Sequence, residues 1–255
     1  MRVEELLNKH FEEFSENEKY VCRYLYGHFE ECGKTTIDEF AFSCGVSKTL
    51  LVRFAKKLGL TGYSELKARI KIERREQTGD VRGLLQTMTD SYHKMMDDLN
   101  TKDLTGFFEK LYRAKRVFVY GSGSSQARAA SEMKRIFLPV REVIHLHGHD
   151  MCYALKKSAS PEDLVIMISL TGESEHVVGL ARELKTGGVP TVSITRMTSS
   201  RLALECEENL YINSVRLPVE YRIDYESSTP YFILIEYLYL SYQNYLAEKQ
   251  VYKIT

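Results

Sequence analysis

The sequence of 255 residues contains no tryptophan, only five prolines and no net charge. Its 44% apolar and 27% charged residues exclude fibrous and disordered classes, which have skewed compositions. The five cysteines are odd in number and never form a CxxC pair, so neither a disulfide framework nor a zinc knuckle is indicated. An apolar run such as residues 164–168 is too short to cross a bilayer. We therefore expect a cytoplasmic globular protein with reduced thiols and no membrane partner.

The balanced overall charge conceals an asymmetry in the first third of the chain. Residues 1–46 carry five lysines and arginines against ten acidic residues, whereas residues 47–77 carry nine against three. A chain of zero net charge can therefore present one positive face to nucleic acid while the rest of its surface repels phosphate. The candidate nucleic-acid surface lies within residues 47–77.

Two different spacings of apolar residues divide the chain. Up to about residue 77 the spacing is helical with no strand-like alternation, and the polar stretch 77–80 is the best linker candidate. Two further helical segments follow, at about 84–99 and 104–112. The length of the chain also favours two cores over one. We predict three parts: a helical domain over 1–77, a linker and connecting helix over 78–104, and a second domain over 105–255.

The second domain alternates short apolar runs with stretches long enough for helices. Continuously apolar strands joined by such crossovers indicate a parallel sheet covered by helices on both faces. The predicted fold class is α/β, with an all-α N-terminal domain followed by a doubly wound parallel-sheet domain. The expected strands are residues 117–120, 142–144, 164–168, 191–194 and 209–212, and an aromatic-rich helix at 231–248 closes the chain.

Capping signals mark two short helices between residues 36 and 58. Thr36 and Glu39 form a capping box, in which the hydroxyl accepts the Glu39 amide and the carboxylate accepts the Thr36 amide. The first helix is expected to end at Gly45, since glycine adopts the left-handed conformation of a tight turn. Ser47 then caps the second helix. This spacing is typical of a helix-turn-helix, whose second helix enters the major groove of DNA.

The second of these helices has an apolar face and a basic face. On a helical wheel Leu51 faces the core, whereas Thr49, Arg53 and Lys56 face outward. We expect Thr49 and Arg53 near base edges, and Lys56 and Lys57 near phosphates. A capped helix pair with a basic face also occurs as an ordinary solvated surface, so spacing alone leaves both interpretations open. The candidate DNA-binding residues are Ser47, Lys48, Thr49, Arg53, Lys56 and Lys57.

Residues 14–67 resemble the N-terminal domain of the RpiR family of regulators. Much of the resemblance lies in the string VSKTLLVRFAKKLGLTGYSELK at positions 46–67. The resemblance implies DNA binding through the helix-turn-helix. Leu50 is a departure, because the family usually has a small hydroxyl residue there, often facing DNA. Either the operator differs, or Leu50 makes an apolar contact such as one with a thymine methyl group.

Two turns rich in glycine and hydroxyl residues follow predicted strands of the second domain. They are GSGSS at 121–125 and SLTGES at 169–174. At the carboxyl ends of parallel strands, helix N-termini direct free N–H groups outward and bind anions such as phosphate. One such turn is a common connector, but two in one domain favour an anion site. A dinucleotide site is disfavoured because Gln126 occupies the place of the third glycine of its fingerprint.

Residues 105–248 resemble the sugar-isomerase (SIS) domain, in which these two turns bind the phosphate and hydroxyl groups of a phosphosugar. The order of the two domains is itself the RpiR arrangement. The resemblance implies a transcription regulator that senses a sugar phosphate and controls carbohydrate-metabolism genes, without catalysis, metal or cofactor. The matching candidate ligand residues are Ser124, Ser125, Ser169, Thr171, Gly172 and Ser174.

Two other functions stay open on sequence alone. The first is a phosphosugar isomerase or lyase with an accessory helical domain, which would need a general base; Glu132, Glu173 and Glu175 are the candidates. The second is an interaction protein whose helical domain docks on another protein. A regulator of this kind is expected to be a homodimer or homotetramer on a symmetric double-stranded operator, with residues 84–99 and 231–248 as candidate interfaces.

The sequence HLHGHD at 145–150 places three histidines and an aspartate together, which are suitable metal ligands. It follows a predicted strand, where we expect alternate side chains to diverge, and phosphosugar sensing needs no metal. We therefore interpret this segment as a loop at the mouth of the pocket rather than a metal site. Residues 221–230 have no clear periodicity and are a candidate lid or pocket edge.

Overall fold

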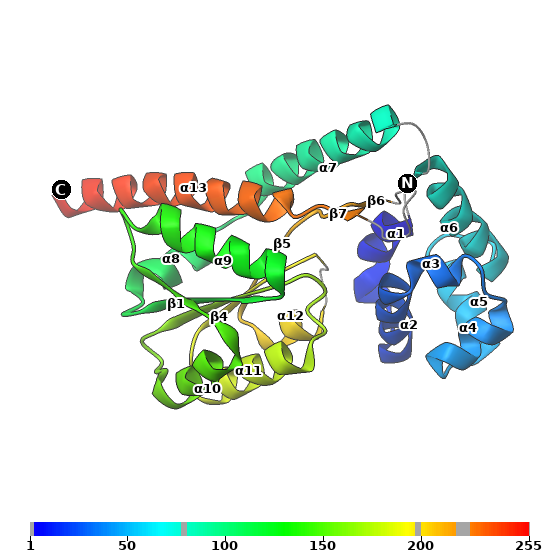
Figure 1. The fold of residues 1–255 in the computed structure, drawn as a ribbon, viewed down its shortest axis with the longest axis horizontal. Coiled ribbons are helices and arrows are strands. Elements are labelled where there is room, and N and C mark those ends of the chain that lie inside the picture. Colours follow the sequence, from blue (N-terminus) through cyan, green and yellow to red (C-terminus); the bar gives the residue numbers. More distant parts are fainter. Residues whose placement is uncertain (1–2, 78–80, 197–199, 218–224, 255) are drawn as a thin grey trace. The chain divides into compact units, whose positions relative to one another are not determined.

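The computed structural model describes residues 3–77, 81–196, 200–217 and 225–254 (Figure 1). Internal contacts divide the chain into two units, Met1–Thr87 with Leu217–Tyr225, and Met88–Arg216 with Glu226–Thr255. Residues 78–80 of the expected linker lie outside the described residues, and Gln77 ends a helix. The connecting helix α7, Val81–Thr101, is longer than the expected 84–99 and supplies residues to both units.

The first unit is helical, as its apolar spacing predicts. The main helices bury an apolar face, and Phe54, Phe40 and Leu66 are among the most buried side chains, whereas Phe42 and Ile72 are exposed. The rings of Phe14 and Phe54 lie 5.0 Å apart, which joins the N-terminal segment to this core. The elements are α1 (Val3–His10), the 3-10 helix η1 (Phe11–Glu13), α2 (Glu16–Gly27), α3 (Phe29–Cys32), α4 (Ile37–Cys44), α5 (Lys48–Lys57) and α6 (Tyr63–Gln77).

The second unit contains a five-stranded parallel sheet with strand order β2-β1-β3-β4-β5. The predicted strands are confirmed, with small shifts of their ends; the second begins at Val143 and extends to Leu146, so it includes His145. The bounds are β1 (Val117–Ser122), β2 (Val143–Leu146), β3 (Leu164–Ser169), β4 (Thr191–Thr195) and β5 (Glu208–Tyr211). A separate two-stranded ribbon, β6 (Arg216–Leu217) and β7 (Tyr225–Glu226), was not expected from the sequence.

Helices cover both faces of the sheet in the second unit (Figure 1). Val117, Val119 and Ile166 belong to one apolar cluster, whereas Phe118 and Met167, the intervening residues of the strands, belong to the other. This alternation follows from the two-residue period of a strand. The first cluster involves α8 (Thr105–Arg113), α9 (Ser124–Phe137) and α13 (Thr229–Ile254), and the second involves α10 (Gly148–Ser158), α11 (Glu175–Thr186) and α12 (Arg201–Glu205).

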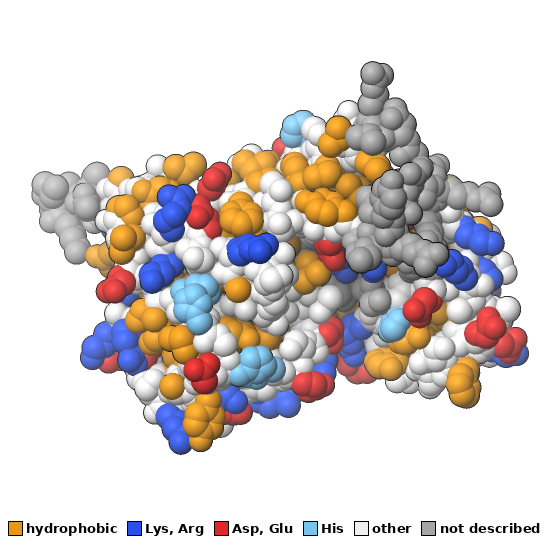
Figure 2. Space-filling view, viewed as in Figure 1, with side chains coloured by type: hydrophobic (Ala, Val, Ile, Leu, Met, Phe, Trp, Pro, Cys, Tyr) orange, Lys and Arg blue, Asp and Glu red, His pale blue; other side chains and the backbone are white. Residues whose placement is uncertain are grey.

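The segment expected to be a lid is described only in part. Residues 221–224 of the expected lid lie outside the described residues, whereas Tyr225–Glu226 form β7 and Thr229 begins α13. Among the described helices, none combines the length and the hydropathy that crossing a bilayer requires. Basic and acidic side chains are interspersed over the visible surface (Figure 2), in agreement with the zero net charge.

Candidate functional site

The helix-turn-helix has the caps that the sequence predicts. Thr36 Oγ1 accepts the Glu39 amide at 3.3 Å, and Glu39 Oε2 accepts the Thr36 amide at 2.6 Å. Gly45 ends α4 with a φ of 62°, the left-handed conformation that a turn needs and that glycine adopts without strain. Ser47 Oγ then accepts the amide of Leu50 at 3.2 Å. These local bonds define where α4 ends and α5 begins.

The two faces of α5 also match the helical wheel. Leu51 is buried, as is its neighbour Phe54, whereas Thr49, Arg53 and Lys56 are exposed. Leu50, which replaces the small hydroxyl residue usual in the resembled family, is half-buried. An exposed helix face of this kind can meet a DNA groove without rearrangement of the core.

Three of the basic residues of α5 are already bound to carboxylates of the same unit. Lys48 pairs with Asp38 of α4. Arg53 Nε lies 3.3 Å from Glu18 Oε1, and Lys57 Nζ lies 2.7 Å from Glu18 Oε2. Lys57, expected near a phosphate, is half-buried and also donates to the backbone oxygen of Glu13 at 2.9 Å. The sequence signal for Glu18 was its place three residues after Ser15, which predicts a cap but not the two basic partners.

The candidate ligand turns begin side by side. Ser122 ends β1, Ser169 ends β3, and these two residues are register partners in adjacent parallel strands. Both turns therefore start at the same edge of the sheet, and each leads into a helix, α9 or α11. The amino-terminal ends of both helices lie at this edge, where anions are favoured.

The first turn requires glycine because it folds closely over its own helix. A Cβ on Gly121 would lie 2.3 Å from the backbone of Gln126, and Gly123 has a φ of 111°. Ser124, the first residue of α9, is exposed and Ser125 is half-buried. Gln126 is buried and donates to the hydroxyl of Tyr231 at 3.1 Å, so α13 supports this turn.

The second turn is organised by Ser169. This residue is buried, and its hydroxyl accepts the Gly172 amide at 3.2 Å. Gly172 has a φ of 68°, and a Cβ there would lie 2.2 Å from Ser200 Oγ, so the turn packs against the start of α12. Thr171 Oγ1 accepts the Glu173 amide at 3.4 Å, and Ser174, which precedes α11, is exposed. Ser169 therefore shapes the turn, while the other hydroxyl groups lie farther out.

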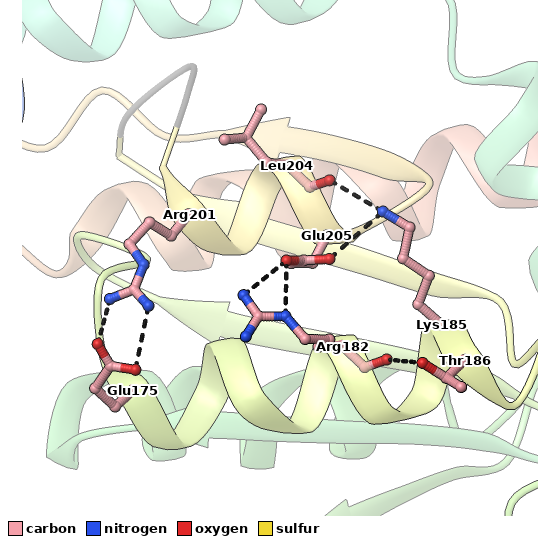
Figure 3. Close-up of polar contacts among 7 residues, drawn as sticks. All are labelled: Glu175, Arg182, Lys185, Thr186, Arg201, Leu204 and Glu205. Carbon is pink, nitrogen blue, oxygen red and sulfur yellow. Dashed lines mark hydrogen bonds and ion pairs between the residues drawn. The ribbon is translucent and has the colours of Figure 1, made fainter. Parts of the chain in front are cut away.

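Ion pairs tie α11 to α12 (Figure 3). Arg201 at the start of α12 pairs with Glu175, and its amide donates to Glu173 Oε1 at 3.1 Å. Farther along the two helices, Arg182 Nη2 lies 3.0 Å from Glu205 Oε1. These contacts hold the segment that packs against Gly172.

The three candidate general bases are engaged in such contacts. Hydrogen bonding to Arg201 lowers the pKa of Glu175, and hydrogen bonding to Arg135 lowers the pKa of Glu132. Glu173 accepts the amide of Arg201. A carboxylate that abstracts a proton near neutral pH needs a raised pKa, so the lowered pKa values of Glu132 and Glu175 disfavour that role for these two residues.

Arg196 is a residue of this edge that the sequence analysis missed. It directly follows β4, and its amide donates to the oxygen of Leu170 in the second turn at 2.9 Å. Its largely buried guanidinium donates through Nη1 to Glu226 Oε1 at 2.6 Å. The only sequence signal was its position two residues after the predicted strand 191–194.

Four histidines form two close ring pairs, one tilted and one stacked, and the expectation that alternate side chains diverge was wrong. The rings of His145 and His147 lie 3.9 Å apart, because residues two apart in an extended segment project to the same side. His149 stacks on His176 of α11 at 3.7 Å, a partner that the sequence analysis missed. Burial lowers the pKa of both His145 and His176. Within the described residues no three histidine, cysteine or acidic side chains are grouped as metal ligands.

Comparison with known proteins establishes the family. Residues 1–77 match the helix-turn-helix domain of the rpiR family, and residues 110–235 match the SIS domain. The chain is 32% identical over 253 residues to the HTH-type transcriptional regulator GlvR of Bacillus subtilis, covering 96% of each chain. The chain belongs to the RpiR family of transcription regulators.

Solved structures share the fold of this RpiR-family regulator. The Vibrio vulnificus NanR protein complexed with ManNAc-6P matches with a TM-score of 0.56 and 20% identity, covering 97% of this chain and 96% of that one. The sugar isomerase domain of an RpiR transcription factor from Sphaerobacter thermophilus matches with a TM-score of 0.55 and 19% identity, covering 66% and 93%. These likenesses confirm a helical N-terminal domain followed by an SIS-type parallel sheet.

Proposed function

We propose that this regulator binds an operator through α5, senses a phosphorylated sugar at the edge of its SIS sheet, and controls genes of carbohydrate metabolism. The observation that carries the proposal is the pairing of Ser122 with Ser169, which starts both glycine-rich turns at one edge of the sheet. Two helix N-termini and several hydroxyl groups then lie at this edge, and such groups favour a phosphate.

Each candidate ligand residue has a defined part in this proposal. Hydroxyl donors are available at the starts of α9 and α11 from Ser124, Ser125 and Ser174. Thr171 lies in the second turn, between β3 and α11. The amide of Gly172 is held by Ser169, so Ser169 acts mainly by shaping the turn. A dianionic phosphate at a helix N-terminus gains from the free N–H groups there. The NanR protein shares this fold, and its structure is a complex with ManNAc-6P. That complex supports a phosphosugar as the ligand class.

For DNA, we propose that the exposed face of α5 enters the major groove. Thr49 and Arg53 are the base-edge candidates, and Lys56 is the phosphate candidate, because all three side chains are exposed. Ser47 and Lys48 lie at the helix N-terminus, where backbone phosphates commonly bind. We leave Lys57 out of the proposed phosphate contacts because Glu18 and Glu13 already bind its ammonium group.

We propose a homodimer or homotetramer, because symmetric operators are read by symmetric proteins. Leu240 of α13, 63% exposed, and Met96 of α7 are exposed apolar residues on the two helices proposed as interfaces. A phosphosugar regulates DNA binding only if the two arrangements of the oligomer differ in their affinity for it. Light scattering of the full chain and of Leu240→Glu tests this assembly, and an unchanged mass would remove α13 from the interface.

The experiment that tests the function is a thermal-shift screen of the full-length chain with a panel of sugar phosphates. The same sugars without phosphate and inorganic phosphate alone serve as controls. We expect at least one sugar phosphate, but not its parent sugar, to raise the melting temperature, because a ligand that binds only the folded state stabilises it. The absence of any shift across the panel would reject phosphosugar sensing, and turnover of a ligand would reject the non-enzymatic assignment.

A further inference from the structure

Glu18 is a charged residue with no exposed surface in the helical unit. It is the third residue of α2, and its Oε2 accepts both the amide and the hydroxyl of Ser15 at 2.8 Å. Lys57 Nζ donates to the same oxygen at 2.7 Å, and Arg53 Nε donates to Oε1 at 3.3 Å. A buried carboxylate is costly unless it is paired and hydrogen-bonded, and here both oxygens have partners.

The two basic partners are spaced to be held together. Arg53 and Lys57 lie four residues apart in α5, so their side chains lie on one face of that helix, one turn apart. Lys57 also donates to the backbone oxygen of Glu13 at 2.9 Å. The carboxylate of Glu18 therefore binds both the exposed face of α5 and Ser15, in the segment that precedes α2.

The contact with Glu18 affects Arg53 and Lys57 differently. The Arg53 side chain is 62% exposed and binds Glu18 through Nε rather than through its terminal amino groups. A long side chain that is already oriented loses less entropy when it binds. Lys57 is 34% exposed, and two of its three ammonium donors are used within the protein. Arg53 is thus presented outward, whereas the charge of Lys57 is compensated.

We propose that Glu18 is a positioning residue of the DNA-binding surface, which presents Arg53 to base edges in a fixed orientation and withdraws Lys57 from phosphate contact. The proposal rests on the proposed role of α5 as the recognition helix. It assigns Glu18 a part in specificity, because without Glu18 both bases are free to contact the phosphates of any sequence. Phosphate contacts carry little sequence information, whereas oriented base contacts do.

Glu18→Gln in the full-length chain tests this proposal. Glutamine at this position still closes a capping box, so the variant removes the charge while keeping the cap of α2. Glu39→Gln is the matched control, because Glu39 holds the same position in the capping box of α4. It changes the net charge by the same amount, and among the described residues Glu39 forms no ion pair with α5.

Binding is measured by fluorescence anisotropy with a mixed-sequence duplex and with a duplex enriched from a random pool by wild-type protein. For Glu18→Gln we expect the mixed-sequence affinity to rise several-fold and the slope of log K against log salt to steepen by about one. The ratio of enriched to mixed affinity should fall by about tenfold, since oriented base contacts supply discrimination of this order. A slope and a ratio equal to those of Glu39→Gln would overturn the proposal.

A second pair of variants tests the proposal even if Glu18→Gln does not fold. Lys57→Met should leave the mixed-sequence affinity within about twofold of wild type and the salt slope unchanged, whereas Lys56→Met should reduce the slope by about one. Equal reductions in both variants would overturn the withdrawal of Lys57. If Arg53→Ala changes neither affinity, the recognition helix itself is misassigned; if it weakens binding while Glu18→Gln behaves as its control, only the positioning role fails.

Discussion

Ser122 and Ser169 are register partners at the last positions of β1 and β3. Their pairing brings together two turns that are separated by more than forty residues of sequence. Since parallel strands in register end at the same edge, neither turn can move far without disturbing a buried strand. The candidate site is therefore built on the rigid sheet, and the effects of substitutions in the turns can be predicted individually.

Ser169→Ala is expected to weaken the response to a sugar phosphate. The hydroxyl accepts the Gly172 amide inside the turn, and loss of one such bond costs about 1 kcal/mol of stability. The ligand-induced rise in melting temperature should shrink or disappear, while DNA affinity without ligand stays close to wild type. Ser131→Ala, on the exposed face of α9, is the control. An unchanged thermal response to ligand would exclude Ser169 from the site.

Gly172→Ala and Gly179→Ala should change stability in opposite directions. At Gly172 the φ of 68° and a contact of 2.2 Å to Ser200 Oγ oppose a Cβ, so we expect a loss of at least about 2 kcal/mol. At Gly179, inside α11, a Cβ meets nothing within 4 Å, so we expect a gain of about 0.5–1 kcal/mol. Denaturant unfolding of both variants measures this difference, and similar values would contradict the geometry of the second turn.

Arg53→Ala is expected to weaken binding to the enriched duplex by about 1–3 kcal/mol. The reason is the loss of an exposed guanidinium from the outer face of α5. The thermal response to sugar phosphate should persist, because the proposed phosphosugar site lies in the other unit. Arg113→Ala removes an exposed base from α8, 76% exposed against 62% for Arg53, and serves as the control. If both variants bound the enriched duplex alike, the assignment of α5 would be refuted.

Asp163→Asn is expected to reduce the acid sensitivity of the sheet unit. Hydrogen bonds from Arg116 lower the pKa of this buried carboxyl from 3.8 to about 2. A lowered pKa in the folded state stabilises the fold above pH 3.8, and this contribution is lost as the pH falls from 3.8 toward 2. The variant should lose about 2 kcal/mol near neutral pH.

The check is the melting temperature of wild type and Asp163→Asn across this acid range. The difference between them should narrow as the pH falls. Glu162→Gln, which removes an exposed partner of Lys115, should change little at any pH. A difference that stays constant down to the lowest pH would show that ionisation of Asp163 does not stabilise the fold.

Local features were predictable from sequence to the level of individual bonds. The Thr36–Glu39 box, the left-handed Gly45 and the Ser47 cap depend on residues three or four positions apart. The strands were predictable for a related reason, because a run such as 164–168 is apolar at every position and must be covered on both faces. The end of the last helix differs from the expectation, because α13 extends to Ile254 rather than to residue 248.

Contacts between distant residues were not predictable in this way. In the sequence Glu18 is only one of the ten acidic residues of 1–46, and its two partners lie 35 and 39 residues away. His176 and Arg196 were overlooked, since their partners His149 and Glu226 come from other elements. No periodicity of a single segment records which side chain of another element will face it.

The amino-acid sequence alone determined the helical first unit and the parallel sheet with its two glycine-rich turns, because caps and periods are short-range properties, and its contiguous motifs carried the resemblance to the family. Tertiary structure alone decided which charged side chains are exposed for binding and which form ion pairs within the protein. The physical reason is that ion pairs such as Glu18 with Arg53 depend on how separate helices pack. That packing is set by the whole core rather than by either segment.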